Sequence, residues 1–280
     1  MLYVNLGCGS RYHPAWINYD ISASGPEIIA HDLRYGIPLP GGNCDVVYHS
    51  HVLEHLRRAE ALRFMRECFR VLKPGGILRV AVPDLEQICL RYLEKLESVL
   101  AHQANSVDDY DWMMLELYDQ TVREQPGGEM RAFLGHRPLR NESFVYERIG
   151  EEARTIIDHK EQKSLPAKRD WARLENALRY RIRSLLDSLA KQALTLTRGE
   201  QSRRALEIGT FRLAGEVHQW MYDRFSLSRL MTVVGFKDPV QKSATESQIA
   251  GWASFNLDTL ADGTVVKPDS LFMEAVKPCP

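Results

Sequence analysis

The sequence predicts an α/β fold built on a parallel sheet and interrupted by a long helical insertion. Over residues 1–84, short apolar runs alternate with turn residues and with one helical segment. From about residue 85 to 222 the apolar residues recur at spacings of three and four, and over 225–276 the strand-like runs return. Strands that alternate with helical segments are typical of parallel sheets whose faces are both covered.

Five strands are expected in the N-terminal part, each a short apolar run bounded by turn residues. They lie at residues 2–6, 16–21, 27–30, 45–49 and 77–82. A helix is expected over 59–72, because apolar residues there follow one another at helical spacing. The segment from Lys73 to Gly76 should end this helix, since proline and glycine do not continue it.

Two amphipathic helices are expected in the middle of the chain. The first contains Ile88, Tyr92, Leu96 and Leu100, and the second carries an apolar stripe from Trp171 to Leu196. Between them, glycine and proline at 125–128 and 135–138 indicate irregular structure. Near the C-terminus, Ser226 is expected to cap a helix that runs to Val234 and stops at Gly235. Strands over 237–244 and 271–276 complete the sheet.

Charge is unevenly distributed along this middle segment. Residues 91–124 carry eight acidic and three basic side chains, whereas residues 153–204 carry thirteen basic and six acidic ones. We interpret these stretches as solvated helix faces that oppose each other. Contact of the basic helix with an anionic substrate or a membrane surface is the alternative.

The composition excludes several classes of protein. The 280 residues have a formal net charge of -1, which argues against a nucleic-acid binder. The five cysteines form no CxxC pair, so neither a disulfide framework nor a zinc site is expected, and no metal is assigned. The sequence contains no apolar run long enough to span a bilayer and no secretory signal, so we expect a cytoplasmic protein without a membrane span.

The segment most indicative of function is Leu6-Gly7-Cys8-Gly9, directly after the first strand. Glycine brings no side chain, so a ligand can lie against this backbone, and open α/β sheets bind ligands at this end of their strands. Asp20 ends the second strand eleven residues after Gly9, where a carboxylate can accept both hydroxyls of a ribose.

The connection between these two strands favours an adenosyl cofactor over NAD. Only residues 11–15 separate the loop from the second strand, and Pro14 interrupts them, so a crossover helix has at most about one turn. A dinucleotide rests its pyrophosphate on the N-terminus of such a helix, whereas S-adenosylmethionine carries no phosphate.

The chain resembles the class I S-adenosylmethionine-dependent methyltransferases of the type 11 kind. The resemblance covers about 1–84 and 217–277 and leaves the middle unmatched. It rests on segments 6–9, 16–20, 31–33, 45–47, 51–56, 70–76, 225–227 and 235–236. The run from Val52-Leu53-Glu54-His55-Leu56 to Arg70-Val71-Leu72-Lys73-Pro74-Gly75-Gly76 is specific in combination.

This resemblance implies a Rossmann-like, seven-stranded sheet of order 3-2-1-4-5-7-6 with the last strand antiparallel. Residues 1–84 and 217–280 would form the cofactor-binding domain, and 85–216 would be a helical insertion that caps the cleft and selects the acceptor. The chain would be an enzyme with S-adenosyl-L-methionine as its cofactor.

The resemblance also implies site residues. Gly7, Cys8 and Gly9 would lie against the methionine and ribose. Asp20 would bind the ribose, Ile21 would pack on the adenine, and Asp32 and Leu33 would contact its edge. Ser50 and His51 would face the methyl donor. Asn5 and Arg11 depart from the family pattern, which often has an acidic residue and a third glycine at these positions.

The expected reaction is transfer of a methyl group to an oxygen or nitrogen of a small-molecule or glycan-type acceptor. His51 or His218 is the candidate base, because a histidine near neutral pKa suits that step. Glu54 and His55 are interpreted as helix-start and packing residues, and Cys8 as a filler of the loop. A non-catalytic adenosyl-binding or scaffold protein and an NAD-dependent oxidoreductase stay open as alternatives, as does the oligomeric state.

Overall fold

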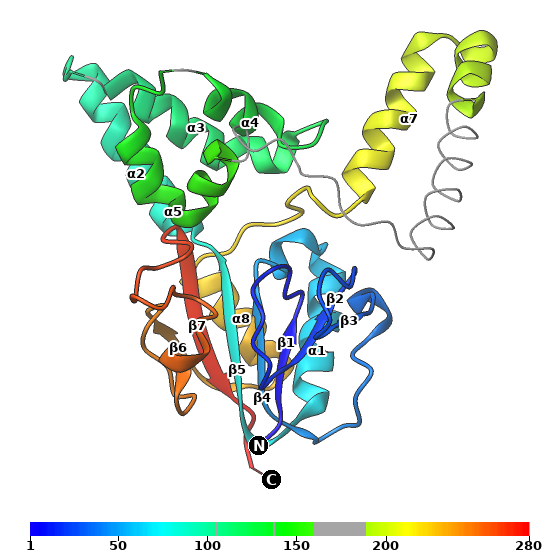
Figure 1. Ribbon diagram of the computed structural model, residues 1–280, viewed down its shortest axis with the longest axis vertical. Helices are drawn as coiled ribbons and strands as arrows, with labels where there is room; N and C mark the ends of the chain where they lie inside the picture. Colours follow the sequence, from blue (N-terminus) through cyan, green and yellow to red (C-terminus); the bar gives the residue numbers. More distant parts are fainter. Residues whose placement is uncertain (105, 137, 159–188, 280) are drawn as a thin grey trace.

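The computed structural model describes residues 1–104, 106–136, 138–158 and 189–279 (Figure 1). Its sheet has seven strands in the order β3-β2-β1-β4-β5-β7-β6. Strands β1 to β5 are parallel, and β7 runs antiparallel to both β5 and β6. The expected Rossmann-like sheet with an antiparallel last strand is therefore confirmed.

The strands lie close to their predicted positions. They are β1 Tyr3–Leu6, β2 Ile17–Asp20, β3 Ile28–Ala30, β4 Cys44–Ser50, β5 Leu72–Pro83, β6 Lys237–Lys242 and β7 Ser270–Val276. Strand β5 begins earlier than expected, because Leu72 already pairs with Cys44 before the register shifts to Val46 and Ile77. Lys73 to Gly76 therefore lies within an irregular part of this ladder.

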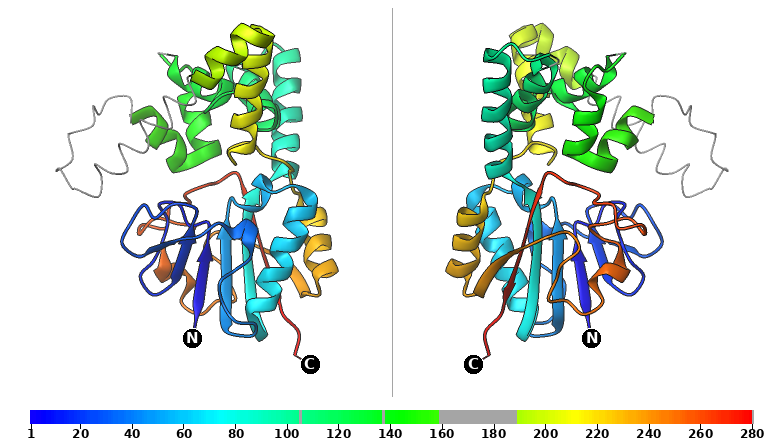
Figure 2. Two further views of the ribbon diagram at one scale, coloured as in Figure 1. Left: turned by 90° about the vertical axis from the view of Figure 1, so that its right-hand side faces the viewer. Right: turned by 90° about the vertical axis from the view of Figure 1, so that its left-hand side faces the viewer.

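Helices and loops cover the two faces of the sheet (Figure 2). Helices α1 (Arg58–Val71) and α8 (Arg224–Val234) pack on one face, where the largest apolar core lies. The loop between β6 and β7, with the short helix η3 (Trp252–Phe255), covers the other face through a cluster of aromatic side chains. Alternation along each strand supplies both cores, because successive side chains point to opposite faces.

The N-terminal cap of α8 differs from the prediction. Asp223 is the cap, and Ser226 is the reciprocal partner in a capping box. The Ser226 backbone N–H donates to the Asp223 carboxylate at 2.7 Å, and the Asp223 N–H donates to the Ser226 hydroxyl at 3.0 Å. Gly235 ends the helix in the left-handed region, at φ 112°, as expected.

The helices of the middle of the chain lie above the sheet. Helices α2 Leu85–Leu100, α3 Ser106–Val122, α4 Gly128–Gly135 and α5 Glu142–Asp158 cluster together there, and α7 Glu200–Leu213 stands apart from them (Figure 1). We call these five helices the helical group. The irregular structure expected at 125–128 and 135–138 is present at 123–127 and at 136 and 138, but helix α4 lies between these positions, and neither α3, α4 nor α5 was expected. Gly127 and Gly128 adopt positive φ at the start of α4, so they mark a helix boundary.

A second apolar core holds helices α2 to α5 together. Its largest fully buried members are Trp112, Met113 and Leu134. Helix α2 starts directly after β5, where the Asp84 carboxylate caps it by accepting from the N–H groups of Glu86 and Gln87. Helices α2 to α5 therefore lie beyond the carboxyl ends of the parallel strands, where open α/β sheets bind their ligands.

Only part of the predicted second amphipathic helix can be compared with the structure. Residues 189–198 are helical, and 171–188 lie outside the described residues. On α7, Arg204 forms an ion pair with Glu124 at 3.3 Å, and Arg212 donates to the Thr121 carbonyl. Basic side chains of α7 therefore lie against the C-terminal end of α3, which belongs to the stretch with an excess of acidic residues. Across the described ranges, no helix is both long and apolar enough to cross a membrane.

Candidate functional site

The glycine loop after β1 and the carboxylate after β2 form one connected unit. Gly7 and Gly9 have positive φ, and a Cβ added to Gly7 would lie 2.3 Å from Val52 Cγ2. The Tyr19 carbonyl accepts from the N–H groups of Gly7 and Cys8, and the Gly9 N–H donates to Asp20 Oδ2 at 2.9 Å. Asp20 therefore faces the loop.

A first cavity, of about 480 Å³, runs along the ends of β1 and β2. We call it the nucleoside cavity. It brings together five of the residues predicted for the cofactor, which are Gly7, Asp20, Ile21, Asp32 and Leu33. The side chain of Ile21 is 67% exposed, so an apolar surface faces this cavity. The C-terminal end of α7, with the residues up to Gly215, lines it from the opposite side.

Asp32 lines the nucleoside cavity but already has a partner. Its carboxylate accepts from the Arg34 guanidinium at 2.7 Å and caps the short helix η1 (Leu33–Tyr35). The hydrogen bond from Arg34 lowers the pKa of Asp32. An adenine amino group would therefore share this carboxylate with Arg34.

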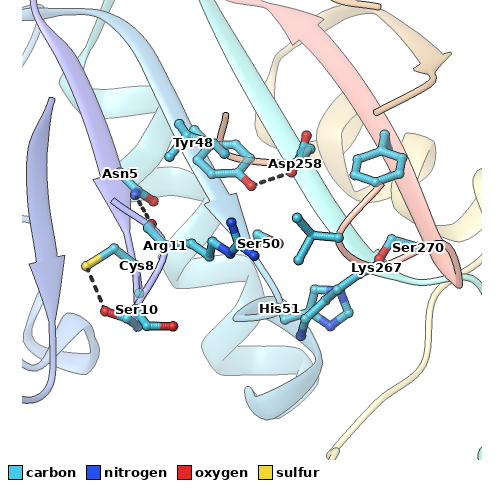
Figure 3. Close-up of a pocket in the computed structure, with 15 residues that line it drawn as sticks. Asn5, Cys8, Ser10, Arg11, Tyr48, Ser50, His51, Asp258, Lys267 and Ser270 are labelled. Carbon is cyan, nitrogen blue, oxygen red and sulfur yellow. Dashed lines mark hydrogen bonds between the residues drawn. The ribbon is translucent and has the colours of Figure 1, made fainter. Parts of the chain in front are cut away.

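The second cavity, of about 260 Å³, lies on the other side of the glycine loop (Figure 3). We call it the loop cavity. The predicted residues Cys8, Gly9, Ser50 and His51 line it, and the side chain of Arg11 points across it toward Ser50. Its other polar lining groups come from distant parts of the chain: Asn5, Tyr48, Asp258, Lys267 and Ser270.

The two departures from the family pattern both lie in the loop cavity. The Asn5 side-chain amide donates to the Arg11 carbonyl at 3.0 Å and to Asn18 Oδ1 at 3.2 Å, so it holds the loop in shape. Arg11 places a positive charge where the resemblance expects glycine. Cys8 is buried, and burial raises the pKa of its thiol to about 11, which agrees with a filler and not a nucleophile.

The third cavity, of about 310 Å³, lies between the sheet and the helical group. We call it the cap cavity. Helices α3 and α4 and the segment between them contribute Gln120, Arg123, Gly127, Met130, Arg131 and Leu134. From the cofactor-binding side come His51, His55, His218, Lys267 and Asp269. His51 lines all three cavities, so they meet at this residue.

His51 is held in a defined orientation. Its Nε2 lies 2.9 Å from Ser270 Oγ, and its Nδ1 lies 3.0 Å from Glu54 Oε1. Its backbone adopts the left-handed conformation, at φ 53°. The structure thus brings both predicted catalytic histidines to the cap cavity, but His218 does not line either of the other two cavities.

Glu54 is surrounded by imidazoles. Its side chain is 0% exposed. Burial by itself would raise its pKa, but attraction to His51, His55 and His218 lowers it to about 2. Burial lowers the pKa of His218 to about 3, so this histidine is neutral at physiological pH. Glu54 and His55, interpreted from the sequence as packing residues, therefore belong to a polar cluster beside the site.

His49 on β4 is a buried histidine of a different kind. Its ring packs against Phe64, and among the described residues neither ring nitrogen has a hydrogen-bond partner. Burial lowers its pKa to about 4, against about 6.5 for an unfolded chain. Between these values the unfolded chain binds the proton and the folded one does not. Stability is therefore complete above pH 6.5 and falls as the pH drops toward 4.

We therefore expect His49→Leu to flatten the acid side of the stability profile. Each such histidine contributes a slope of up to about 1.4 kcal/mol per pH unit between its two pKa values. The free energy of unfolding from urea titrations at pH 7.0, 6.0, 5.0 and 4.5 should thus fall less in the variant than in the wild type. His102→Asn, at an exposed histidine, serves as the control, and parallel profiles for His49→Leu would refute the expectation.

The sequence offered no signal for the residues that the C-terminal segment contributes. Tyr48 donates to Asp258, and Arg79 binds both Asp258 and Glu274 at 2.8 Å. These groups are buried and far apart in the sequence, so only folding brings them together. Through Asp258, these hydrogen bonds and ion pairs hold the segment before β7 against strands β4 and β5, next to the loop cavity.

Comparison with known proteins agrees with the fold and the glycine loop. Residues 8–80 match the family described as methyltransferase domain. This segment, 73 of the 280 residues, is therefore similar to a methyltransferase domain, and the sheet has the strand order that the resemblance implied. The matched segment starts inside the glycine loop and reaches into β5, so it includes Asp20, Asp32, Ser50 and His51.

The similar curated proteins match over short segments of this chain. A protein of Mycolicibacterium smegmatis named "probable S-adenosylmethionine-dependent methyltransferase" is 44% identical over 57 residues, which are 19% of this chain and 21% of that protein. A Mycobacterium tuberculosis protein of the same description is 46% identical over 48 residues, 17% of each. The matches thus span about a fifth of these relatives and say nothing of the rest of either protein.

A solved structure is also similar in outline. The S-adenosylmethionine-dependent methyltransferase from Archaeoglobus fulgidus is 11% identical, with a TM-score of 0.37 over 98% of this chain and 85% of that one. A likeness at this level supports no functional argument. The similarity to methyltransferases therefore rests on the matched segment.

Proposed function

We propose that this protein transfers a methyl group from S-adenosylmethionine to an oxygen or nitrogen atom of a small polar acceptor. The observation that carries the proposal is the meeting of the nucleoside, loop and cap cavities at His51. Two of them border the glycine loop, as a cofactor site requires, and the third opens beneath the helical group, as an acceptor site requires.

The residues around the glycine loop fit the proposed cofactor. The loop has no side chain to fill the space at Gly9, where an added Cβ would meet nothing within 4 Å. Asp20 offers carboxylate oxygens for ribose hydroxyls, and exposed Ile21 offers an apolar surface for adenine. Arg11 supplies the positive charge that the carboxylate of a methionine moiety needs. When bound there, S-adenosylmethionine would supply an electrophilic methyl group.

The chain between β1 and β2 supports this cofactor over a dinucleotide. In the described structure the connection contains turns and no helix. A pyrophosphate would therefore lack the helix N-terminus that usually receives it.

The protein's own contribution to the reaction would be mainly positional. Holding donor and acceptor in line is worth up to roughly 7–11 kcal/mol in favourable cases. We assign His51 to the acceptor side of the transfer, with His218 deeper in the cap cavity. The helical group, residues 85–216, would cover the site and select the acceptor.

The lining of the cap cavity supports a small-molecule or glycan-type acceptor. Gln120, Arg123 and Arg131 face it from the helical group, and Lys267 and Asp269 from the loop before β7. Such a set of hydrogen-bond donors and acceptors suits the hydroxyl groups of a polar acceptor.

Asp20→Ala is expected to weaken S-adenosylmethionine binding by roughly 10- to 100-fold. A hydrogen bond to a charged group is worth about 1.5–3 kcal/mol, and the Gly9 N–H loses its partner as well. Asp20→Asn should lose less, because it keeps an acceptor oxygen. Isothermal titration calorimetry measures both, with Asp262→Ala in an exposed loop as the control. A dissociation constant within twofold of wild type for Asp20→Ala would contradict the assignment.

The proposed activity is tested by two measurements on the full chain. Mass spectrometry of the purified protein should detect a co-purified adenosyl compound, and a methyl-transfer screen against pools of polar metabolites and sugars should find an acceptor. Binding of S-adenosylmethionine without turnover in any pool would favour the non-catalytic alternative. Binding of NAD in its place would overturn the proposal.

A further inference from the structure

Three side chains beside the cap cavity are arranged as metal ligands are. Glu54, His55 and His218 each present one ligand atom, and these atoms lie within 4.8 Å of one another. Two imidazoles and a carboxylate form a common protein ligand set for zinc in sites that keep a further position open. In a tetrahedral zinc site the ligand atoms lie ~3.4 Å apart, so side-chain shifts of ~1 Å would close this cluster around an ion.

Three potential ligand atoms of this cluster lack protein partners. Glu54 Oε1 lies 3.0 Å from His51 Nδ1. In the described part of the chain, Oε2 of Glu54, Nδ1 of His55 and Nδ1 of His218 have no hydrogen-bond partner. Buried polar atoms are almost always satisfied, so three unsatisfied ones in a single cluster indicate a missing binding partner.

The backbone around the cluster fixes its members in place. The Glu54 carbonyl accepts from the N–H groups of Gln219 and Trp220, and the His218 N–H donates to the Gln120 carbonyl. This ties the short helix η2 (Leu53–His55) to the segment before α8, so the two parts of the cluster come from sequence positions more than 160 residues apart.

The two imidazoles of the cluster lie against each other. The ring centroids of His55 and His218 are 4.8 Å apart, with an interplanar angle of 79°. Nδ1 of each ring is buried and has no hydrogen-bond partner among the described residues, so each ring has a nitrogen left to bind an ion.

The cluster is accessible from the site. His55 and His218 line the cap cavity, whereas the side chain of Glu54 lies behind them with 0% exposure. An ion can therefore enter from the cavity, and its remaining coordination positions would face the space that we assign to the acceptor.

We propose that Glu54, His55 and His218 bind one divalent transition-metal ion of the zinc type. Imidazole nitrogen favours such ions over Mg²⁺, which prefers an all-oxygen, octahedral shell. The spacing of the cysteines could not reveal this site, because no cysteine belongs to it. The proposal rests on the ligand geometry and holds whether or not the chain transfers methyl groups.

The test uses the full chain without a histidine tag. The protein is stripped with a chelator, incubated with excess Zn²⁺, desalted, and analysed for metal by mass spectrometry. We expect about one zinc per chain, and no retention of Mg²⁺ in a parallel sample. Glu54→Gln and His218→Gln should each weaken zinc binding by roughly 100-fold or more, since even outer-shell partners contribute 10- to 100-fold. Circular dichroism checks that each variant is folded.

Two controls separate this site from adventitious binding. His102→Asn removes an exposed histidine whose left-handed φ asparagine tolerates, and it should keep the wild-type stoichiometry. Cys89→Ser with Cys279→Ser removes the two exposed thiols, which are the competing zinc ligands, and should also keep it. Should Glu54→Gln fail to fold, His55→Gln is expected to give the same loss.

The proposal is overturned if the stripped wild type retains no zinc, if the ligand variants retain as much as the wild type, or if the cysteine variant loses the metal. S-adenosylmethionine affinity, measured with and without Zn²⁺, keeps the two proposals apart. Failure to bind the cofactor leaves the metal site standing, and failure to bind zinc leaves the proposed methyl transfer standing.

Discussion

Replacing His51 by asparagine is expected to lower kcat for methyl transfer by roughly 10²- to 10⁴-fold, the usual contribution of a side chain positioned to transfer a proton. The three cavities meet at this residue. With Glu54 at Nδ1, the ring directs Nε2 toward Ser270 and the loop cavity. A carboxylate that orients a histidine while leaving its Nε2 to accept a proton is a recurrent catalytic arrangement.

The change should affect turnover far more than cofactor binding. Asparagine tolerates the left-handed φ of His51, so the backbone is expected to keep its shape. The measurements are kcat and KM with the acceptor from the screen, and the dissociation constant of S-adenosylmethionine by calorimetry. His102→Asn is the matched control, because His102 has a similar φ of 55° on an exposed turn. An unchanged kcat would remove His51 from the reaction.

Arg79→Met is expected to lower the free energy of unfolding by about 3–5 kcal/mol. The Arg79 side chain is 0% exposed, and its guanidinium binds the carboxylates of Asp258 and Glu274. Methionine replaces the stem of the arginine side chain but not its guanidinium group, so two buried carboxylates would lose their common partner. The cost arises mainly from these uncompensated groups and not from the lost contacts themselves.

Urea unfolding of the wild type and of two variants measures this effect. Arg91→Met is the matched control, because Arg91 pairs with Glu94 at the surface, where such pairs contribute about 0–1 kcal/mol. A loss of less than about 1 kcal/mol for Arg79→Met would show that the buried network does not stabilise this fold. A selective loss of cofactor binding at full stability would instead place its role at the loop cavity.

Local patterns in the sequence predicted the sheet well. Each strand of the cofactor-binding part is a short apolar run ended by turn residues, and such runs are readable because the side chains alternate between two buried faces. The glycine loop was equally visible, since positive φ at Gly7 and Gly9 demands the residue type. Asp20, Ile21, Asp32 and Leu33 follow directly after strands, so their shared cavity could be predicted from topology.

The helical group was predicted less well. Helix α4 and the kinked helix α5 are interrupted or bounded by glycines, which in a sequence indicate loops as readily as helix ends. At Gly150 the positive φ lets α5 approach Pro268 and the Val266 carbonyl, a contact that depends on a residue more than 100 positions away. The local pattern of apolar residues in a sequence cannot indicate such a distant contact.

The sequence alone determined the fold class, the sheet order through its family motifs, and the residues of the glycine loop. These depend on backbone conformation and on the burial of neighbouring side chains, which are short-range properties. The tertiary structure alone decided that Glu54, His55 and His218 converge, that Arg79 binds two carboxylates, and that three cavities meet at His51. The free energy of these contacts depends on which distant groups share a water-poor space, and only the folded chain defines that space.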